Sequence, residues 1–132
     1  MGAIEIISAS VASFIFGALW YGPLFGKTWA KLMNFTDRDA KKAKQKGMAK
    51  LLIANFVGTL ITVFVLSTLL NRMYINSVAK SAEVAVLLWL GFYASSTLLG
   101  GVLWESKPIK LYMLNAVYWL INLIIIGAIV VL

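Results

Sequence analysis

The sequence contains four long apolar runs, and nearly every basic residue lies between them. Each run is about 20 residues long, which is the length that an α-helix needs to cross a hydrocarbon core of about 30 Å. Backbone polar groups inside a bilayer must be satisfied within their own segment, and the runs lack the alternation of barrel strands. We therefore expect four transmembrane helices, over residues 3–22, 51–70, 84–104 and 111–132.

The four runs leave no room for a separate soluble domain. Hydrophobic residues make up 61% of the 132 residues, which is more apolar surface than a soluble domain of this size could bury. The first run is not preceded by Lys or Arg, whereas a signal peptide begins with a basic segment, so we interpret it as a retained helix. The sequence thus predicts one all-α domain, an integral membrane four-helix bundle made of two tandem helical hairpins.

Basic residues are distributed unevenly over the loops. The first and third loops together carry ten Lys and Arg residues, whereas the opposite side has only Arg72 and Lys80. Lys and Arg are enriched in the cytoplasmic loops of membrane proteins. We therefore expect the first and third loops in the cytoplasm and both termini outside.

A group of lysines near the end of the first loop has two interpretations. It contributes to the topology signal, or it contacts anionic lipid headgroups, which attract basic segments by about 1 kcal/mol per charge. Because no aromatic residues interleave with the group, we expect no binding to nucleic acid. The lysines are Lys41, Lys42, Lys44, Lys46 and Lys50.

The first loop is expected to contain helices. Apolar side chains between Leu24 and Met33 fall on one side of a helix, with Lys27 and Lys31 on the other, which predicts a short helix in the membrane interface. Pro23 marks the point where the preceding helix must break or turn.

A second helical segment is predicted further along the same loop. Thr36 is followed three residues later by Asp39, which is a capping-box pattern at the start of a helix. A helix over residues 37–50 that continues into the second span is therefore expected, and Gly47 weakens that continuity.

The two hairpins share a sequence pattern. Residues 17–20 and 101–104 both read G-x-L-W and precede a proline, and residues 50–57 and 110–117 both read K-L-x-x-x-N-x-V. Because both hairpins enter from the same side, a true internal repeat would be parallel, with a pseudo-two-fold axis along the membrane normal. Chance similarity between apolar helices is the alternative.

Each run carries polar and small residues on one helical face, and we expect these faces to turn inward. An unpaired amide in lipid costs several kcal/mol. The faces serve either as packing contacts, with interhelical hydrogen bonds of about 0.6 to 2 kcal/mol each, or as the wall of a polar cavity. The cavity would be lined by Asn55, Thr59, Tyr93, Asn115, Tyr118 and Asn122.

Four aromatic residues lie at or near the basic loops. Trp and Tyr are enriched at membrane interfaces, so we expect these residues to anchor helices there, with ligand binding as the alternative. They are Trp20, Tyr21, Trp29 and Trp104.

Residue types exclude much chemistry. The absence of Cys and His removes thiolates, imidazole or thiolate metal sites and the commonest general base. No Asp, Glu, Lys or Arg lies in the middle of a span, which disfavours proton coupling. Glu105, at a constrained turn before Pro108, is the carboxylate that we single out, and a solvated interfacial carboxylate is the alternative. We expect no catalytic residue, metal or cofactor.

One stretch resembles a known family. Residues 17–29, GALWYGPLFGKTW, are similar to the opening signature of small bacterial membrane proteins catalogued as domain of unknown function 1761. The resemblance covers most of the chain and implies a four-helix protein of the bacterial cytoplasmic (inner) membrane, without any activity. Lys107 stands where Arg is expected, which keeps the charge and weakens any bidentate role. The family's closing segment is similar at Glu105, Lys107, Pro108, Leu111, Asn115, Tyr118 and Gly127.

Two functions are compatible with these features. The first, which we predict, is a non-enzymatic bundle that forms a homo-oligomer or binds another membrane protein through small-residue faces. The alternative is a small transporter or channel-like facilitator for a neutral or weakly polar solute, which would pass through the polar cavity. An enzyme is disfavoured because no nucleophile, base and metal ligand converge. The small residues are Ala9, Ser13 and Gly17 in the first run, and Gly91 and Ser95 in the third.

Overall fold

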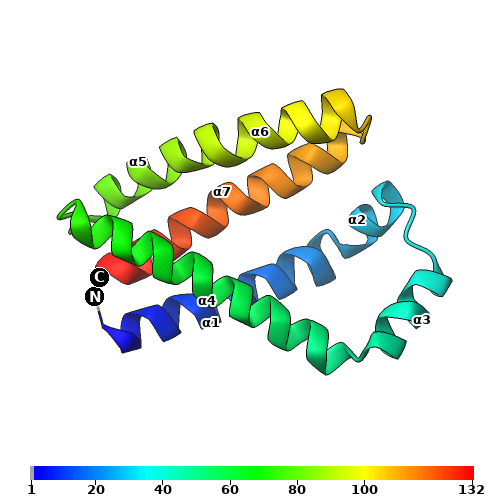
Figure 1. Ribbon diagram of the computed structural model, residues 1–132, viewed down its shortest axis with the longest axis horizontal. Helices are drawn as coiled ribbons and strands as arrows, with labels where there is room; N and C mark the ends of the chain where they lie inside the picture. Colours follow the sequence, from blue (N-terminus) through cyan, green and yellow to red (C-terminus); the bar gives the residue numbers. More distant parts are fainter. Residues whose placement is uncertain (1) are drawn as a thin grey trace.

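The computed structural model describes residues 2–132, whose regular structure is entirely helical. Four long apolar helices pack together, and short helices occupy the first loop (Figure 1). This confirms the predicted all-α four-helix architecture. The long helices are α1 (Ala3–Leu19) with the π-helical turn η1 (Trp20–Leu24), α4 (Met48–Arg72), the helix from α5 (Val78–Leu88) to η3 (Leu98–Trp104), and α7 (Ile109–Val131).

All four helices are long and apolar enough to cross a membrane. Together with the sequence, this identifies the chain as a small multi-pass membrane protein. The third span begins at Val78, ahead of the apolar run, because Ser77 caps it by accepting a hydrogen bond from the Lys80 backbone N–H at 3.1 Å.

The third span contains π-helical turns that the apolar pattern did not predict. The turns η2 (Trp89–Ala94) and η3 flank the short segment α6 (Ser95–Thr97). A third π-helical turn, η1, contains Pro23 at the end of α1. Because proline lacks an N–H, the regular α-helical ladder cannot continue there, which agrees with the predicted break.

The first loop folds into two helices. The first, α2 (Gly26–Leu32), is the short helix that the amphipathic pattern predicted. The second, α3 (Asp37–Lys46), begins with the predicted capping box, in which Thr36 N–H donates to Asp39 Oδ2 at 2.9 Å. Gly47 has a φ of 95°, which few other residues adopt, so α3 ends there and does not continue into α4.

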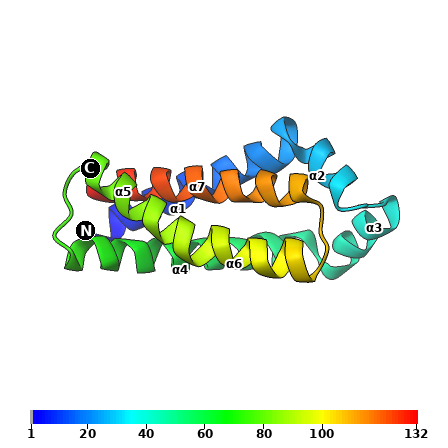
Figure 2. The same cartoon turned by 90° about the horizontal axis from the view of Figure 1, so that it is seen from above.

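The helix α7 lies at the centre of the bundle. It packs along both α1 and α5 and also contacts α4, while α4 packs on α1 (Figures 1 and 2). We call the end with the first and third loops the basic end and the end with both termini the opposite end. At the basic end, α4 diverges from the segment α6–η3 (Figure 1).

The two hairpins do not pack in a two-fold symmetric way. Within each hairpin the two long helices are neighbours, as a repeat requires. A pseudo-two-fold axis would match the contact between α1 and α7 with an equal contact between α4 and α5. Among the described residues, α4 and α5 make no contact of comparable extent.

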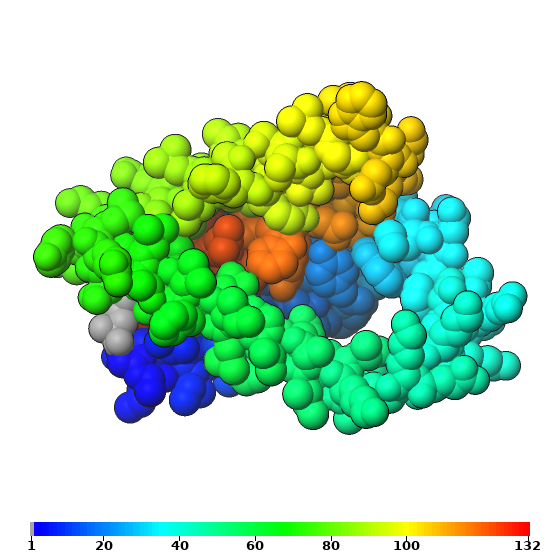
Figure 3. All heavy atoms as spheres, viewed as in Figure 1, coloured from blue at the N-terminus to red at the C-terminus, as the bar shows by residue number. Residues whose placement is uncertain are grey.

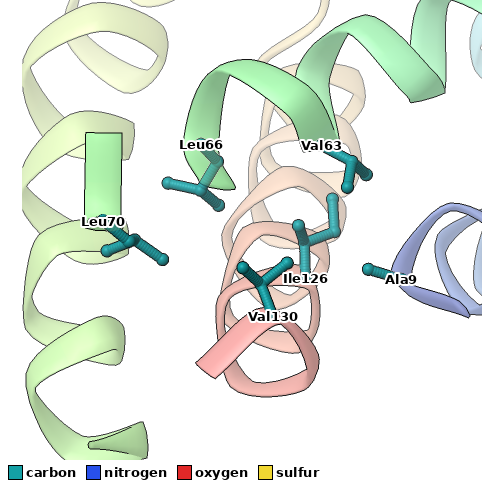
Figure 4. Close-up of a cluster of buried hydrophobic side chains, with 6 residues drawn as sticks. All are labelled: Ala9, Val63, Leu66, Leu70, Ile126 and Val130. Atoms are coloured by element: carbon teal, nitrogen blue, oxygen red, sulfur yellow. The ribbon is translucent and has the colours of Figure 1, made fainter. Parts of the chain in front are cut away.

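A closed apolar core holds the opposite half of the bundle together. Side chains from α1, α4 and α7 point toward one another there and are at most 4% exposed (Figure 4). They interdigitate closely, which supplies the dispersion contacts that hold helices together where both lipid and protein are apolar. This closed core consists of Ala9, Val63, Leu66, Leu70, Ile126 and Val130.

Candidate functional site

A cavity of about 580 Å³ lies between α1, α4 and α7, on the basic side of the closed core. In the space-filling view, side chains of α7 and α1 are visible in a hollow between α4 and the α5–η3 helix (Figure 3). None of the described residues that line it is charged. We call it the central cavity; its lining is Ser13, Phe14, Gly17, Ala18, Tyr21, Leu52, Asn55, Gly58, Thr59, Thr62, Tyr118, Trp119 and Asn122.

The structure brings four of the six predicted cavity residues together around the central cavity. Asn55, Thr59, Tyr118 and Asn122 line the central cavity. Tyr93 does not line the cavity. Its ring packs on Trp119 with the ring centroids 5.9 Å apart.

The sixth predicted residue, Asn115, lies in a smaller pocket next to α2 and η3. Its Oδ1 accepts a hydrogen bond at 2.6 Å from the hydroxyl of Tyr21, whose side chain does line the central cavity. Asn115 therefore fixes the side chain of Tyr21 in the cavity wall without lining the cavity itself.

Two of the amides join the first span, α1 with η1, to α7. Ser13 Oγ donates to Asn122 Oδ1 at 2.7 Å in a fully buried pair, in the same way as Tyr21 donates to Asn115. Hydrogen bonds of this kind contribute about 0.6 to 2 kcal/mol each between membrane helices. The contacts of Asn115 and Asn122 are therefore those expected of residues that hold helices together.

Asn55 is different, because its side-chain amide has no hydrogen-bond partner among the described residues. It is exposed and lines the central cavity from α4. The neighbouring hydroxyls are satisfied by their own helix: Thr59 Oγ1 donates to the Asn55 carbonyl at 2.9 Å, and Thr62 Oγ1 to the Gly58 carbonyl at 3.1 Å. Asn55 is therefore the polar group on this wall that remains free to bind a molecule in the cavity.

An aromatic cluster centred on Tyr118 forms the facing wall. Its ring stacks on Phe16 with centroids 5.3 Å apart and an interplanar angle of 6°, and meets Tyr21 and Trp119 edge-on at 5.0 and 5.5 Å. Gly17 makes this arrangement possible, since a methyl group at that position would come within 2.9 Å of Tyr118 Oη. The wall thus offers broad, polarizable ring faces opposite the free amide.

Sequence reasoning assigned Tyr21 to the interface and left Trp119 out of the predicted cavity. Tyr21 lies on the same helical face as Ser13 and Gly17, at spacings of four residues, and that face turns to the cavity. The spacing was therefore an available signal. The polar face that was predicted to turn inward includes Tyr21, although Tyr21 was also predicted to anchor the helix in the interface and was not named as a cavity residue.

The other predicted functional residues lie outside the cavity. Glu105 pairs with Lys107 at 3.0 Å, and both side chains are more than half exposed. Across residues 2–132, no group of three His, Cys, Asp and Glu side chains could hold a metal ion. The lysines Lys41, Lys42, Lys44, Lys46 and Lys50 are all exposed, on α3 and at the start of α4.

Comparison with known proteins gives a match to a family model. A family model with the description "Protein of unknown function (DUF1761)" matches residues 4–131, which is nearly the whole chain. No curated protein matches the chain, and no solved structure does.

Proposed function

The chain belongs to the family described as Protein of unknown function (DUF1761), and we propose that it is a non-enzymatic facilitator that binds a small uncharged solute in the central cavity. The observation that carries this proposal is the lining of the cavity, which has a free amide and stacked aromatic rings but no charged side chain among the described residues that form it. A volume of about 580 Å³ falls within the range of small-molecule sites.

Two walls give the solute its expected chemistry. Asn55 offers one acceptor and two donors to hydroxyl, amide or carbonyl groups. Tyr118 and Trp119 offer ring faces to the less polar part of the molecule. A charged solute would find no opposite charge and would bear the full penalty of desolvation.

Passage across the membrane requires a second conformation. The cavity lies on the basic side of the closed core, and that core separates it from the opposite end. Transport therefore involves a change in how α1, α4 and α7 pack around Val63 and Ile126, as in other carriers that expose one side at a time.

A cavity-filling variant and a matched control test the proposal. A Cβ atom added at Gly58 or at Gly91 would meet nothing within 4 Å, so the two positions are matched sites for Leu substitutions. Only Gly58 lines the central cavity. Purified protein is reconstituted into liposomes, and glycerol, urea and xylitol fluxes are followed by stopped-flow light scattering.

Wild-type protein is expected to accelerate the flux of at least one of these solutes over empty liposomes. Gly58→Leu should return that flux to the level of empty liposomes, whereas Gly91→Leu should leave it unchanged. Equal fluxes for Gly58→Leu and wild type, or no flux above empty liposomes for the three solutes, would reject the facilitator.

Self-association is a second candidate, which a different observation favours. On α1, the small residues Ala9 and Ser13 are buried inside the bundle, and Gly17 lies against Tyr118. The third span is the least buried of the four, and its Gly91 and Ser95 face outward. Small residues at this spacing let two helices approach closely in a membrane.

The same pair of variants separates the two candidates. Gly91→Leu should lower the fraction of dimers seen by single-molecule photobleaching in liposomes, while Gly58→Leu should not. A monomeric wild-type protein would eliminate self-association and leave the facilitator untouched.

We also propose that the basic end faces the cytoplasm. The support is the excess of Lys and Arg in the first and third loops. In intact cells, a cysteine introduced at Lys44 should resist an impermeant maleimide that labels a cysteine introduced at Lys80. The reverse pattern would invert the topology.

A further inference from the structure

A second hollow, of about 890 Å³, lies at the basic end between η1 and α2 on one side and the start of α7 on the other. We propose that it binds an anionic phospholipid, with the phosphate at its lysines and the upper acyl chain along its apolar wall. We call it the lysine groove. It is separate from the central cavity and from the lysines of α3.

Three ammonium groups surround this groove. Lys27 and Lys31 come from α2, and Lys110 comes from the first turn of α7. No acidic residue lines the groove, and the one ion pair in residues 2–132 joins Glu105 to Lys107. The three charges therefore lack a protein counter-charge, and a phosphate oxygen is the acceptor that ammonium groups bind as point charges.

Trp20 supplies an independent observation at the same site. It forms part of the groove wall and is 8% exposed, held against Phe25 with ring centroids 4.5 Å apart. Its Nε1 is buried without a hydrogen-bond partner among the described residues. A buried indole donor normally has an acceptor, and a phosphate or ester oxygen in the groove would provide one when the indole turns so that Nε1 reaches the groove surface.

The rest of the wall selects a lipid over a free phosphate ion. Beyond the lysines, Phe25, Met113 and Val117 line the groove with apolar surface. The helix α7 is long and apolar enough to span a membrane from Ile109 onward, so the proposal places this surface just inside the depth at which headgroups meet acyl chains. A free phosphate ion would use only the lysines, whereas a phospholipid uses both parts of the groove.

The proposal is tested with purified full-length protein and two lipids that share the same acyl chains, phosphatidylglycerol and phosphatidylcholine. Native mass spectrometry and thermal unfolding report lipid binding. The groove variant is Lys27→Gln/Lys31→Gln/Lys110→Gln. Its matched control, Lys41→Gln/Lys42→Gln/Lys44→Gln, removes the same net charge from α3. Inorganic phosphate is added as a separate competitor.

Wild-type protein is expected to prefer phosphatidylglycerol, and the groove variant should bind it about a hundredfold more weakly, as three lost lysine contacts predict. The control variant should lose less than about fivefold. Equal losses in both variants would show diffuse attraction and overturn the site. Displacement of the lipid by inorganic phosphate would overturn it in favour of a free-phosphate site.

Two single changes keep the proposal testable if the triple variant does not fold. Lys110→Gln should weaken phosphatidylglycerol binding about fivefold. Trp20→Phe keeps the ring and removes the donor, and it should reduce binding of both lipids without changing their ratio. An unchanged affinity in both variants would reject the groove as a lipid site.

Discussion

The same three helices form two very different halves of this bundle. Near the opposite end, α1, α4 and α7 close around Ala9, Val63 and Ile126, which are fully buried. Toward the basic end they surround a cavity of about 580 Å³, where Asn55 is exposed and has no partner among the described residues. A helix that packs tightly at one end therefore need not do so along its whole length.

Helix crossing gives the physical reason for this difference. Helices that cross at an angle touch closely near one point and separate away from it. Where α4 meets α1 and α7, small or branched side chains interdigitate. Further along, Gly58 lines the central cavity, and a Cβ added there would meet nothing within 4 Å.

The largest contrast is expected in the reactivity of introduced cysteines, since the chain has none of its own. The thiolate that reacts with maleimides forms only where water reaches the side chain. In liposomes, Asn55→Cys should react rapidly because it lines the central cavity. Leu66→Cys, which replaces a side chain that is 4% exposed in the closed core, should react only when the bundle opens locally.

A control at a position exposed to lipid shows whether reactivity reports contact with water or only exposure on the protein surface. Val57 is 49% exposed but does not line the cavity. If lipid covers it, Val57→Cys should remain unreactive in liposomes and become reactive in denaturant. Equal rates at residues 55 and 57 would mean that the cavity is filled by lipid and that the two halves do not differ in hydration.

Truncation of one leucine in each half should give the next largest effect. Leu70 is completely buried in the closed core, and Leu70→Ala should lower the free energy of unfolding by about 3 kcal/mol through lost contacts and the cavity left behind. Leu52, at the cavity rim, is 47% exposed, so Leu52→Ala leaves no new enclosed cavity and should cost much less. Reversible unfolding in mixed micelles measures both, and equal losses would contradict the distinction.

How far the sequence predicts this structure depends on whether a feature is determined within one helix or between helices. Run length alone predicted the four spans, because the bilayer sets the number of residues that a helix needs. The start of α3 could also be predicted, because Thr36 and Asp39 form the capping box within a single turn. Features determined within one helix could therefore be predicted from local residue patterns.

The rotation of each helix could not be predicted in the same way. Polar faces were expected to turn inward, and Asn122 does, at 2% exposed. Asn55 and Ser96 belong to similar faces but are exposed, because a polar stripe suits a cavity or a second chain as well as a neighbouring helix. Which of these it meets depends on crossing geometry, which a single sequence does not specify.

A smaller effect on stability is expected from the hydrogen bond that lies at the boundary between the two halves. The buried pair of Ser13 and Asn122 lies where the closed core gives way to the cavity. A double-mutant cycle with Ser13→Ala and Asn122→Ala should give a coupling energy of about 1 kcal/mol. Tyr21→Phe with Asn115→Ala is the matched cycle at the basic end, where water in the cavity competes for the same groups.

The coupling should be weaker in the second cycle, because water that reaches Tyr21 can replace the lost partner. Unfolding of the four single and two double variants in mixed micelles gives both energies. A larger value for Tyr21 and Asn115 would show that the basic half is the drier one.

The smallest expected effect concerns α3, outside both halves. The Thr36 backbone N–H, followed by its hydroxyl, holds the pKa of Asp39 below its ordinary value of 3.8. The ionised carboxylate therefore stabilises the start of α3 above that value, and the stabilisation is lost as the pH falls through the lowered pKa. Hydrogen exchange of residues 36–46 should accelerate below pH 3.8 in wild type relative to Asp39→Asn, which does not titrate, while residues 63–70 stay protected. A simultaneous loss in both segments would mean that the closed core depends on the first loop and does not stand on its own packing.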